Sequence, residues 1–204
     1  MGAVLSENAR KISGSGVSSD KFPVYVTGNP HKAAYFARLI GREIEHHDID
    51  IAEIQSGSLD EVVEHKVRSA YETLQRPVIV EDTALGFSAL HGLPGPFIKF
   101  FVSLPNGDEL LCRMCDGLSS RKATASTTFA YFDGETVRLF HGSHSGEIAD
   151  HPRGKNGFGW DTIFVADGQE GLTRAELDQV HYDELYLKIK PIAQVSEFLA
   201  TLST

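Results

Sequence analysis

A short apolar run that leads through a glycine turn into a helix start constrains the fold of this chain more than any other feature. Residues 24–26 (VYV) predict a strand, and residues 27–30 (TGNP) supply a tight turn, an N-cap asparagine and a proline suited to the first helical position. The helix should run to about Ile40 and stop at Gly41. A strand that enters a helix N-terminus in this way presents free N–H groups, so the turn is also a candidate anion site.

Helix and strand signals alternate through the first half of the chain, and a hairpin follows in the second half. Ser58 and Glu61 form a capping box at the start of an apolar stripe with helical spacing, and Asp133-Gly134 is a strong hairpin turn. The expected elements are a helix over 58–75, a buried strand over 77–80, strands over 123–132 and 137–141, and an amphipathic helix over 191–202. This order predicts an α/β protein with a mixed sheet rather than a purely parallel one.

The length of 204 residues corresponds to one domain, or to two small lobes that share a core. Residues 1–21 are rich in serine, glycine and polar residues without a period, so we expect a flexible N-terminal extension and a single domain over 22–204. No run approaches the ~18 apolar residues that a membrane helix needs, which excludes a spanning protein. Two cysteines cannot staple a secreted scaffold of this size, which favours a reducing, cytoplasmic location.

The charge balance is 19 basic against 28 acidic residues, a formal net charge of −9. Non-specific nucleic-acid binders normally carry the opposite sign, so we expect no nucleic-acid partner. Residues 43–64 hold eight acids and no lysine or arginine, which leaves 28 − 8 = 20 acids against 19 bases elsewhere. Most of this acidic run should be a solvated face. Binding of a small phosphorylated ligand depends on the local field of its cleft, and the net charge does not exclude it.

Two lysines are candidate phosphate ligands. Lys32 lies in the first turn after Thr27-Gly28-Asn29, where a bound phosphate would offset its repulsion by the helix dipole; the alternative is a plain N-cap beside a solvated lysine. Lys66 falls three and four residues after two valines of the apolar stripe, so it either reaches a buried site or extends its ammonium to a nearby surface.

Two acids, Glu81 and Asp82, follow the apolar strand together with Thr83. Ligands of open α/β sheets gather at the carboxyl ends of strands, and neighbouring strand residues point to opposite faces, so only one of the two acids can face a given cleft. A carboxylate there suits Mg²⁺ or a water molecule as general base. The alternative is a solvated loop.

An aromatic pair beside an acid, Phe158-Gly159-Trp160-Asp161, lies on a glycine-rich loop and could stack a base and accept from its ring N–H. The alternative is a tryptophan that anchors the loop to the core. The lone C-x-x-C of Cys112 and Cys115 has no second pair for zinc, so we expect two packing cysteines.

Four motifs occur in a specific order: TGNxxK at 27–32, VEDT at 80–83, GLPGP at 92–96 and FGWD at 158–161. Together with the acid and lysines between them, they closely resemble the inosine triphosphate pyrophosphatase family, also called the Ham1 family, over about residues 24–177. The resemblance implies a two-lobed α/β fold around a long mixed β-sheet with a central active-site cleft. It also implies a homodimer that uses Mg²⁺ to split nucleoside triphosphates of non-standard purines (ITP, dITP, XTP) into the monophosphate and pyrophosphate.

The roles implied by the resemblance can be carried over residue by residue. The family's triphosphate ligands match Thr27, Asn29 and Lys32, and its phosphate-binding lysine matches Lys66. The residues that serve the metal and the attacking water match Glu53 and Asp82. The aromatic residue that stacks on the base matches Phe158, and the pocket around the base matches Trp160 and Asp161. Thr83 and Lys99 are further expected substrate contacts in the cleft. We expect Asp82 to be the general base, Lys66 to assist catalysis and Glu53 to be a metal ligand, while Glu81 tunes its neighbours.

The chain departs from the family after its T-x-A-E segment, at 173–176. Where the family has K-N-x-x-S-H-R, this chain has Tyr182, Asp183, Tyr186, Leu187 and Lys188. In the family the His-Arg pair contacts the keto edge of the base; Leu187 cannot donate a hydrogen bond, and Lys188 donates only as a point charge. Three interpretations remain: base selection rebuilt from His181, Tyr182, Tyr186 and Lys188, a different nucleotide substrate, or a non-catalytic nucleotide-binding protein.

Overall fold

The computed structural model describes residues 22–202, so the expectation of a flexible segment over 1–21 lies outside the described residues. Seven strands form one mixed sheet in the order β2-β1-β3-β5-β6-β7, with β4 paired to β3. The strands are β1 (Val24–Val26), β2 (His46–His47), β3 (Val78–Phe87), β4 (Pro94–Gly95), β5 (Lys122–Phe132), β6 (Val137–Ile148) and β7 (Phe164–Ala166). The prediction of an α/β fold with a mixed sheet is confirmed.

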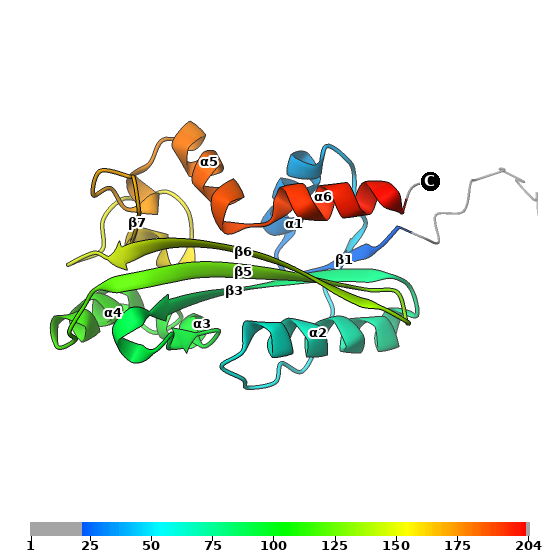
Figure 1. Cartoon of the computed structure of the whole chain (residues 1–204), viewed down its shortest axis with the longest axis horizontal. Coiled ribbons are helices and arrows are strands. Elements are labelled where there is room, and N and C mark those ends of the chain that lie inside the picture. Colours follow the sequence, from blue (N-terminus) through cyan, green and yellow to red (C-terminus); the bar gives the residue numbers. More distant parts are fainter. Residues whose placement is uncertain (1–21, 203–204) are drawn as a thin grey trace, which may run out of the picture.

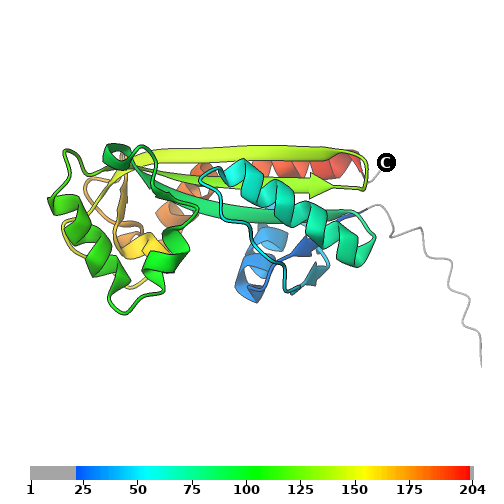
Figure 2. The ribbon, with the colours of Figure 1, turned by 90° about the horizontal axis from the view of Figure 1, so that it is seen from below.

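Helices cover both faces of the sheet (Figure 1). One face carries α1 (Pro30–Ile40), α5 (Gln179–Ile189) and α6 (Ile192–Thr201), and the other carries α2 (Leu59–Leu74), α3 (Ile98–Val102) and α4 (Gly107–Asp116). Viewed from below, α3 and α4 lie at one end of the long strands and α2 lies toward the other end (Figure 2). Among the described residues, no helix is long and apolar enough to cross a membrane.

Three apolar clusters fill the space between these layers. One cluster packs Val24, Val63 and Val78 between β1, α2 and β3, and a second packs Tyr25 and Phe36 between β1 and α1 on the opposite face. A third cluster occupies the α3–α4 end of the sheet and includes Cys112 and Cys115, which are buried and free. The prediction that the cysteines are packing residues is confirmed.

The first helix–strand signals are confirmed, with one local correction at α2. Ser58 caps this helix by accepting a hydrogen bond from the Glu61 amide at 3.4 Å. The reciprocal half of the expected capping box is wrong, because the Glu61 carboxylate accepts from the Ser56 hydroxyl at 2.6 Å and the Ser58 amide donates to the same hydroxyl at 3.0 Å. A serine two residues before the cap therefore replaces the glutamate.

The buried strand that was expected to end before Glu81 continues through it, and this is the main correction to the fold. β3 stays in antiparallel register with β5 for its whole length, from the Val78–Phe132 pair to the Phe87–Ala123 pair. The acid pair therefore lies in the middle of a strand and not in a loop beyond it. The return strand β6 is also longer than predicted, because its pairing with β5 runs from Val137 to Glu147.

The opposite edge of β3 is only partly paired. β1 pairs with Val78 and Ile79, β4 pairs with Leu85 and Gly86, and the described chain places no strand beside the stretch between them, residues 80–84. We call this stretch the open edge of β3. Both acids lie in this open edge, so no neighbouring strand of the described chain covers their side of β3 and a ligand can approach them there.

Candidate active site

The two acids of the open edge serve opposite faces of the sheet, as strand alternation predicts. Val78 and Val80 pack in the cluster beneath α2, whereas Ile79 packs in the cluster beneath α1 and α6. Asp82 therefore faces the α2 side, and Glu81 and Thr83 face the α1 side. Asp82 is half-buried and accepts a hydrogen bond from the Thr83 amide at 2.8 Å.

A cavity of about 780 Å³ lies beside the open edge. Its lining joins the β1–α1 turn, the acidic segment after β2, α2 and β3, and includes Thr27, Gly28, Lys32, Asp48, Asp50, Glu53, Lys66, Glu81 and Asp82. Most predicted phosphate and metal ligands thus meet in one place although they come from four parts of the chain. The acidic run 43–64 is mostly exposed, as expected, and Glu53 is one of the members that line this cavity.

The β1–α1 turn is held by its own side chains. The Asn29 amide donates to the Thr27 hydroxyl at 3.2 Å, and the Lys32 amide donates to Asn29 Oδ1 at 3.3 Å, which confirms Asn29 as the N-cap. A Cβ at Gly28 would lie 2.9 Å from Asp48 Oδ1, so the turn needs a residue without a side chain. Lys32 is not a solvated lysine, because its Nζ lies 3.0 Å from Glu81 Oε1 and its side chain is 24% exposed.

Glu81 is the buried centre of a three-residue ion cluster. Lys190, which follows α5, places Nζ 2.6 Å from both Glu81 oxygens, and Lys32 contacts the same carboxylate. Burial alone would raise the pKa of Glu81, but the charges of Lys190 and Lys32 and their hydrogen bonds hold it well below its usual range. Burial lowers the pKa of Lys190 in spite of its carboxylate partner. The contact to Glu81 raises the pKa of Lys32, so this lysine keeps its charge at neutral pH.

On the α2 side of the open edge, Lys66 and Lys99 bracket Glu53. Lys66 Nζ lies 3.5 Å from Glu53 Oε1 and 3.5 Å from the Glu81 carbonyl oxygen, and Lys99 forms an ion pair with the other Glu53 oxygen. Lys66 therefore extends toward β3 rather than outward from its helix. This geometry explains a lysine on an apolar stripe and favours the site interpretation over the surface one.

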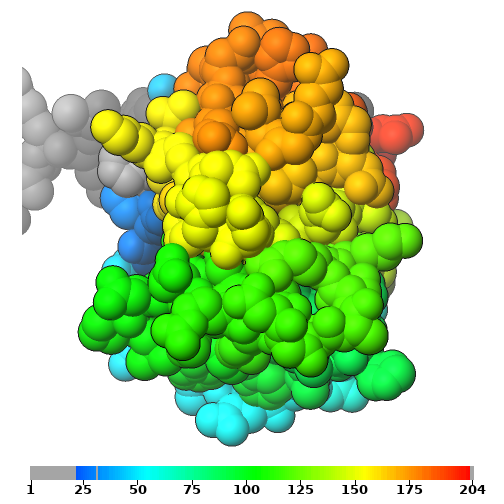
Figure 3. Space-filling view, turned by 90° about the vertical axis from the view of Figure 1, so that its left-hand side faces the viewer, coloured from blue at the N-terminus to red at the C-terminus, as the bar shows by residue number. Residues whose placement is uncertain are grey.

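The glycine-rich loop before β7 holds its aromatic residues in two different environments. Trp160 is buried and packs edge-on against Phe164 with ring centroids 5.5 Å apart, so it does anchor the loop to the core. Phe158 is 56% exposed and free to meet a ligand. Figure 3 shows this loop, in yellow, packed between the green region around α4 and the orange segment that leads into α5.

The Asp161 carboxylate fixes the glycine-rich loop through contacts made by both of its oxygens. Its Oδ1 forms a 2.7 Å ion pair with Arg174, and its Oδ2 accepts from the Tyr182 hydroxyl and the Phe158 amide, both at 2.9 Å. Burial raises the pKa of Asp161 despite the charge of Arg174 beside it. Both carboxylate oxygens are thus engaged by the protein itself.

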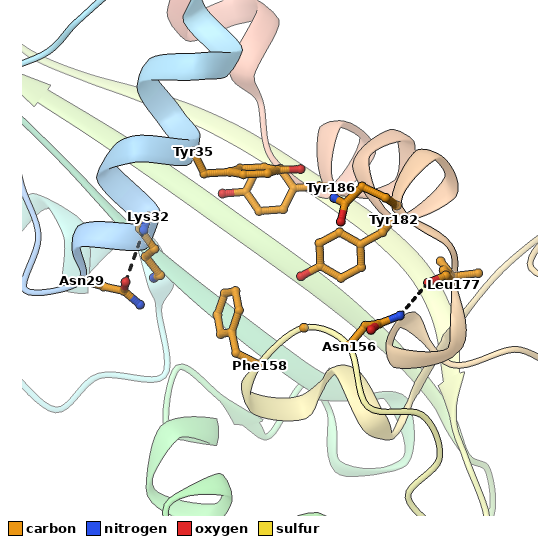
Figure 4. Close-up of a pocket in the computed structure, with 10 residues that line it drawn as sticks. Asn29, Lys32, Tyr35, Asn156, Phe158, Leu177, Tyr182 and Tyr186 are labelled. Carbon is orange, nitrogen blue, oxygen red and sulfur yellow. Dashed lines mark hydrogen bonds between the residues drawn. The ribbon is translucent and has the colours of Figure 1, made fainter.

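A second cavity, of about 630 Å³, opens between this loop, α1 and α5 (Figure 4). Tyr35 and Tyr186 lie on one side of it, and Phe158 lies between Lys32 and Tyr182 on the other. Lys32 lines both this cavity and the one beside the open edge, so a ligand with an anionic end and an aromatic end can span them. The anionic end would lie near Lys32 and Lys66, and the aromatic end beside Phe158.

Comparison with known proteins decides the family. A model of the Ham1 family matches residues 23–198. The chain belongs to the Ham1 family.

Relatives and solved structures agree with this assignment. An inosine triphosphate pyrophosphatase of Schizosaccharomyces pombe is 43% identical over 151 residues, which is 72% of this chain and 79% of the relative. An inosine triphosphate pyrophosphatase of Emericella nidulans is 40% identical over 179 residues, 86% of this chain and 94% of the relative. The structure of a HAM1 protein from Coxiella burnetii superposes with a TM-score of 0.78 at 25% identity, covering 88% of this chain and 99% of that one.

Within this Ham1-family chain, the structure brings most predicted site residues together and leaves one outside. Thr83 lies on the α1 side of β3 with its hydroxyl 3.5 Å from that of Thr127. Lys188, in contrast, is exposed on α5 and lines neither the cavity beside the open edge nor the aromatic cavity, and its neighbour Leu187 is 47% exposed. Asp183 is engaged by Tyr35 and Arg38.

Sequence reasoning missed Lys190 and Arg174, two buried cations of this Ham1-family site. Lys190 is 109 residues from Glu81, and Arg174 occupies the variable position of the T-x-A-E segment. The sequence signal for each was a basic residue within a predominantly apolar or turn-forming segment. Such a signal indicates that the residue can be buried, but it does not identify the acid with which it pairs.

Proposed function

We propose that this Ham1-family chain is a nucleoside triphosphate pyrophosphohydrolase that converts non-standard purine nucleoside triphosphates (ITP, dITP, XTP) into the monophosphate and pyrophosphate. It is a hydrolase of a phosphoric anhydride bond. The observation that carries the proposal is the arrangement at the open edge of β3, where Asp82 lies in one cavity with Lys32 and Lys66 in a chain about 40% identical to proteins named inosine triphosphate pyrophosphatase. The alternatives of a different nucleotide or a non-catalytic binding protein are not favoured by these relatives.

The nucleotide would span the two cavities. In this proposal Thr27, Asn29 and Lys32 hold the triphosphate at the N-terminus of α1, where the helix dipole and the Lys32 ammonium favour an anion. Lys66 and Lys99 add positive charge from the opposite side, and Thr83 contributes a hydroxyl from β3. The base lies against the exposed Phe158 ring in the aromatic cavity between the glycine-rich loop, α1 and α5, because bases stack on aromatic rings.

The donor set fits a divalent cation of the Mg²⁺ type. Among the described residues no three His, Cys, Asp or Glu side chains form a ready cation cage, but Mg²⁺ typically takes one or two carboxylates and completes its shell with water and phosphate oxygens. Glu53 and Asp82 are the carboxylates that would hold it. When bound, Mg²⁺ would neutralise phosphate charge in the transition state.

The chain's own residues would carry the hydrolytic step. Asp82 orients a water molecule toward the α-phosphorus and accepts its proton as the new P–O bond forms. The bond from the α-phosphorus to the bridging oxygen breaks, and pyrophosphate leaves with that oxygen. Lys32 and Lys66 neutralise the charge that accumulates on the leaving group. The buried Glu81 supports this role because its carboxylate keeps Lys32 protonated and in place.

A substrate panel tests the proposed function. The full chain is incubated with Mg²⁺ and ITP, XTP, dITP or each standard triphosphate, and released pyrophosphate and orthophosphate are measured separately. We expect pyrophosphate from ITP and XTP at rates well above those from ATP and GTP, and no activity after removal of divalent cations with a chelator. Preference for a standard triphosphate, or release of orthophosphate alone, would overturn the proposal.

Removing the Phe158 ring is expected to weaken substrate binding without affecting the fold. Stacking of a base on an aromatic ring is worth about 1–3 kcal/mol, so Phe158→Ala should raise KM for ITP about 5- to 150-fold. The ring is more than half exposed, so the melting temperature should not fall. Leu172→Ala is the matched control, since Leu172 is 44% exposed and lines none of the described cavities. Equal KM values for the Phe158 variant and the wild type would contradict the stacking role.

A homodimer in the cytoplasm is the proposed working form. Support for association comes from Leu93, Phe100 and Leu104, large apolar residues near one another in the chain that are about half exposed. Support for a reducing compartment comes from the two free cysteines. Light scattering on the purified chain should give 2 × 22.3 = 44.6 kDa, and a mass of 22.3 kDa would contradict the dimer.

A further inference from the structure

Arg174 is a buried cation whose hydrogen bonds are incomplete. It is 6% exposed, and the atom Nε is buried with no hydrogen-bond partner among the described residues. Buried donors are almost always paired in folded proteins, so a specific exception calls for an explanation.

The guanidinium is held in a fixed orientation. Its Nη1 pairs with Asp161 Oδ1 at 2.7 Å, and its central carbon lies 5.3 Å from the Trp160 ring and 4.8 Å from the Tyr182 ring. Asp161 is itself fixed by the Tyr182 hydroxyl and the Phe158 amide. Charge pairing on one edge and aromatic rings beside it leave little freedom to rotate, so the guanidinium keeps its orientation.

Arg174 lies at a recess that adjoins the proposed base cavity. The recess, of about 70 Å³, is lined by Arg174, Phe158, Trp160, Tyr186 and Lys190, among others. It shares Lys32, Phe158 and Tyr186 with the larger cavity in which the base would stack. Its volume suits an exocyclic group or water rather than a whole purine ring.

The residues that match the family's base-reading pair do not line this recess or the larger cavity. Leu187 and Lys188 are both exposed on α5, and Lys188 lines neither cavity. Positions 187 and 188 therefore offer no donor to either cavity, whereas a buried, oriented guanidinium lines the recess from a different segment, the short helix at Arg174–Glu176.

We propose that Arg174 is the specificity-determining residue that reads the keto oxygen at C6 of the purine, in place of the missing His-Arg pair. A guanidinium only donates hydrogen bonds, so it favours a keto oxygen, which accepts them, and disfavours the amino group of adenine, which is itself a donor. The inference rests on the proposed function, because it assigns the base-reading residue of the same site. Arg174 selects 6-oxopurines as a class and does not by itself separate inosine from guanosine nucleotides.

The test measures equilibrium binding and does not depend on turnover. Calorimetry with IMP, AMP and purine riboside monophosphate, which lacks the keto oxygen, is carried out on the wild type and on Arg174→Lys. A charged hydrogen bond predicts that the wild type binds IMP about 10- to 100-fold more tightly than either analogue. Arg174→Lys should reduce this ratio about 10-fold or more through weaker IMP binding, with AMP affinity unchanged.

Two control variants separate this role from a structural one. Arg153→Lys changes an arginine of the same region that pairs with Glu176 and Asp150 and lines neither cavity, so it should leave the ratio intact. Lys188→Met tests the position that matches the family's arginine. A ratio that falls in Lys188→Met and not in Arg174→Lys would overturn the proposal, and so would equal loss of IMP and AMP binding in Arg174→Lys.

The ligand series keeps the proposal falsifiable if Arg174→Lys does not fold. Equal affinity of the wild type for IMP and purine riboside monophosphate would overturn it without any variant. A wild type that discriminates between these ligands but hydrolyses no triphosphate in the substrate panel would contradict the proposed function while supporting the assignment of Arg174.

Discussion

An Asp82→Asn variant is expected to lose turnover of ITP by about 10²- to 10⁴-fold in kcat, the usual contribution of a positioned general base. The amide oxygen of asparagine can still accept the hydrogen bond that Thr83 donates to Asp82 at 2.8 Å, so the local strand should be preserved. The amide cannot take a proton from water, and it brings no negative charge to a cation. In the proposed binding mode the nucleotide is held mainly by Lys32, Lys66 and the α1 N-terminus, so nucleotide binding should survive.

Single-turnover kinetics and calorimetry with ITP separate these effects. Asp133→Asn is a suitable control, since Asp133 also accepts backbone hydrogen bonds, from Glu135 and Thr136, but lies in the β5–β6 hairpin turn, where asparagine before glycine is favoured. The control should keep wild-type kcat. An Asp82→Asn enzyme with near-normal kcat would remove Asp82 from the chemistry.

The second large effect is expected on stability, from Glu81→Gln. Glu81 is buried between Lys190 and Lys32, and removing its charge leaves two ammonium groups close together with no carboxylate. Breaking a buried ion cluster at one partner typically costs about 3–5 kcal/mol, which for a chain of this size lowers the melting temperature by roughly 6–20 °C. Glu43→Gln removes an exposed acid instead and should change the melting temperature by much less.

The pH dependence of unfolding gives an independent test of the same cluster. Because the folded-state pKa of Glu81 lies below its ordinary value, its stabilising contribution is complete above the ordinary glutamate pKa and is lost as pH falls through the lowered one. Below about pH 4, the wild type should therefore lose unfolding free energy more steeply than Glu81→Gln. The double variant Glu81→Gln, Lys190→Met should recover part of the lost stability. Parallel pH profiles for wild type and Glu81→Gln would contradict the buried ion cluster.

Local sequence signals predicted the start of a helix or the turn of a hairpin correctly where a capping residue, a proline or a turn dipeptide marks it. The Asn29 cap and Pro30 begin α1, the Ser58 cap begins α2, and Asp133-Gly134 closes the β5–β6 hairpin. Strand lengths were less predictable, because the continuation of β3 through Glu81 and Asp82 depends on register with β5 and not on the polarity of those two side chains.

The sequence by itself determined the family and the order of its four motifs, because each motif is a local arrangement of a turn, a helix start or a strand. Only the tertiary structure decided which acidic and basic side chains form ion pairs in the core. The contact between Glu81 and Lys190 joins residues 109 positions apart, and the contact between Asp161 and Arg174 joins the glycine-rich loop to the segment before α5. Neither pairing has a sequence pattern, since ion pairing in a core depends on which elements pack together and how much water they exclude. For the same reason Lys188, which matches a base-reading position of the family, lies at the surface, while Arg174, at a position that the family motif leaves variable, lies at the proposed base site.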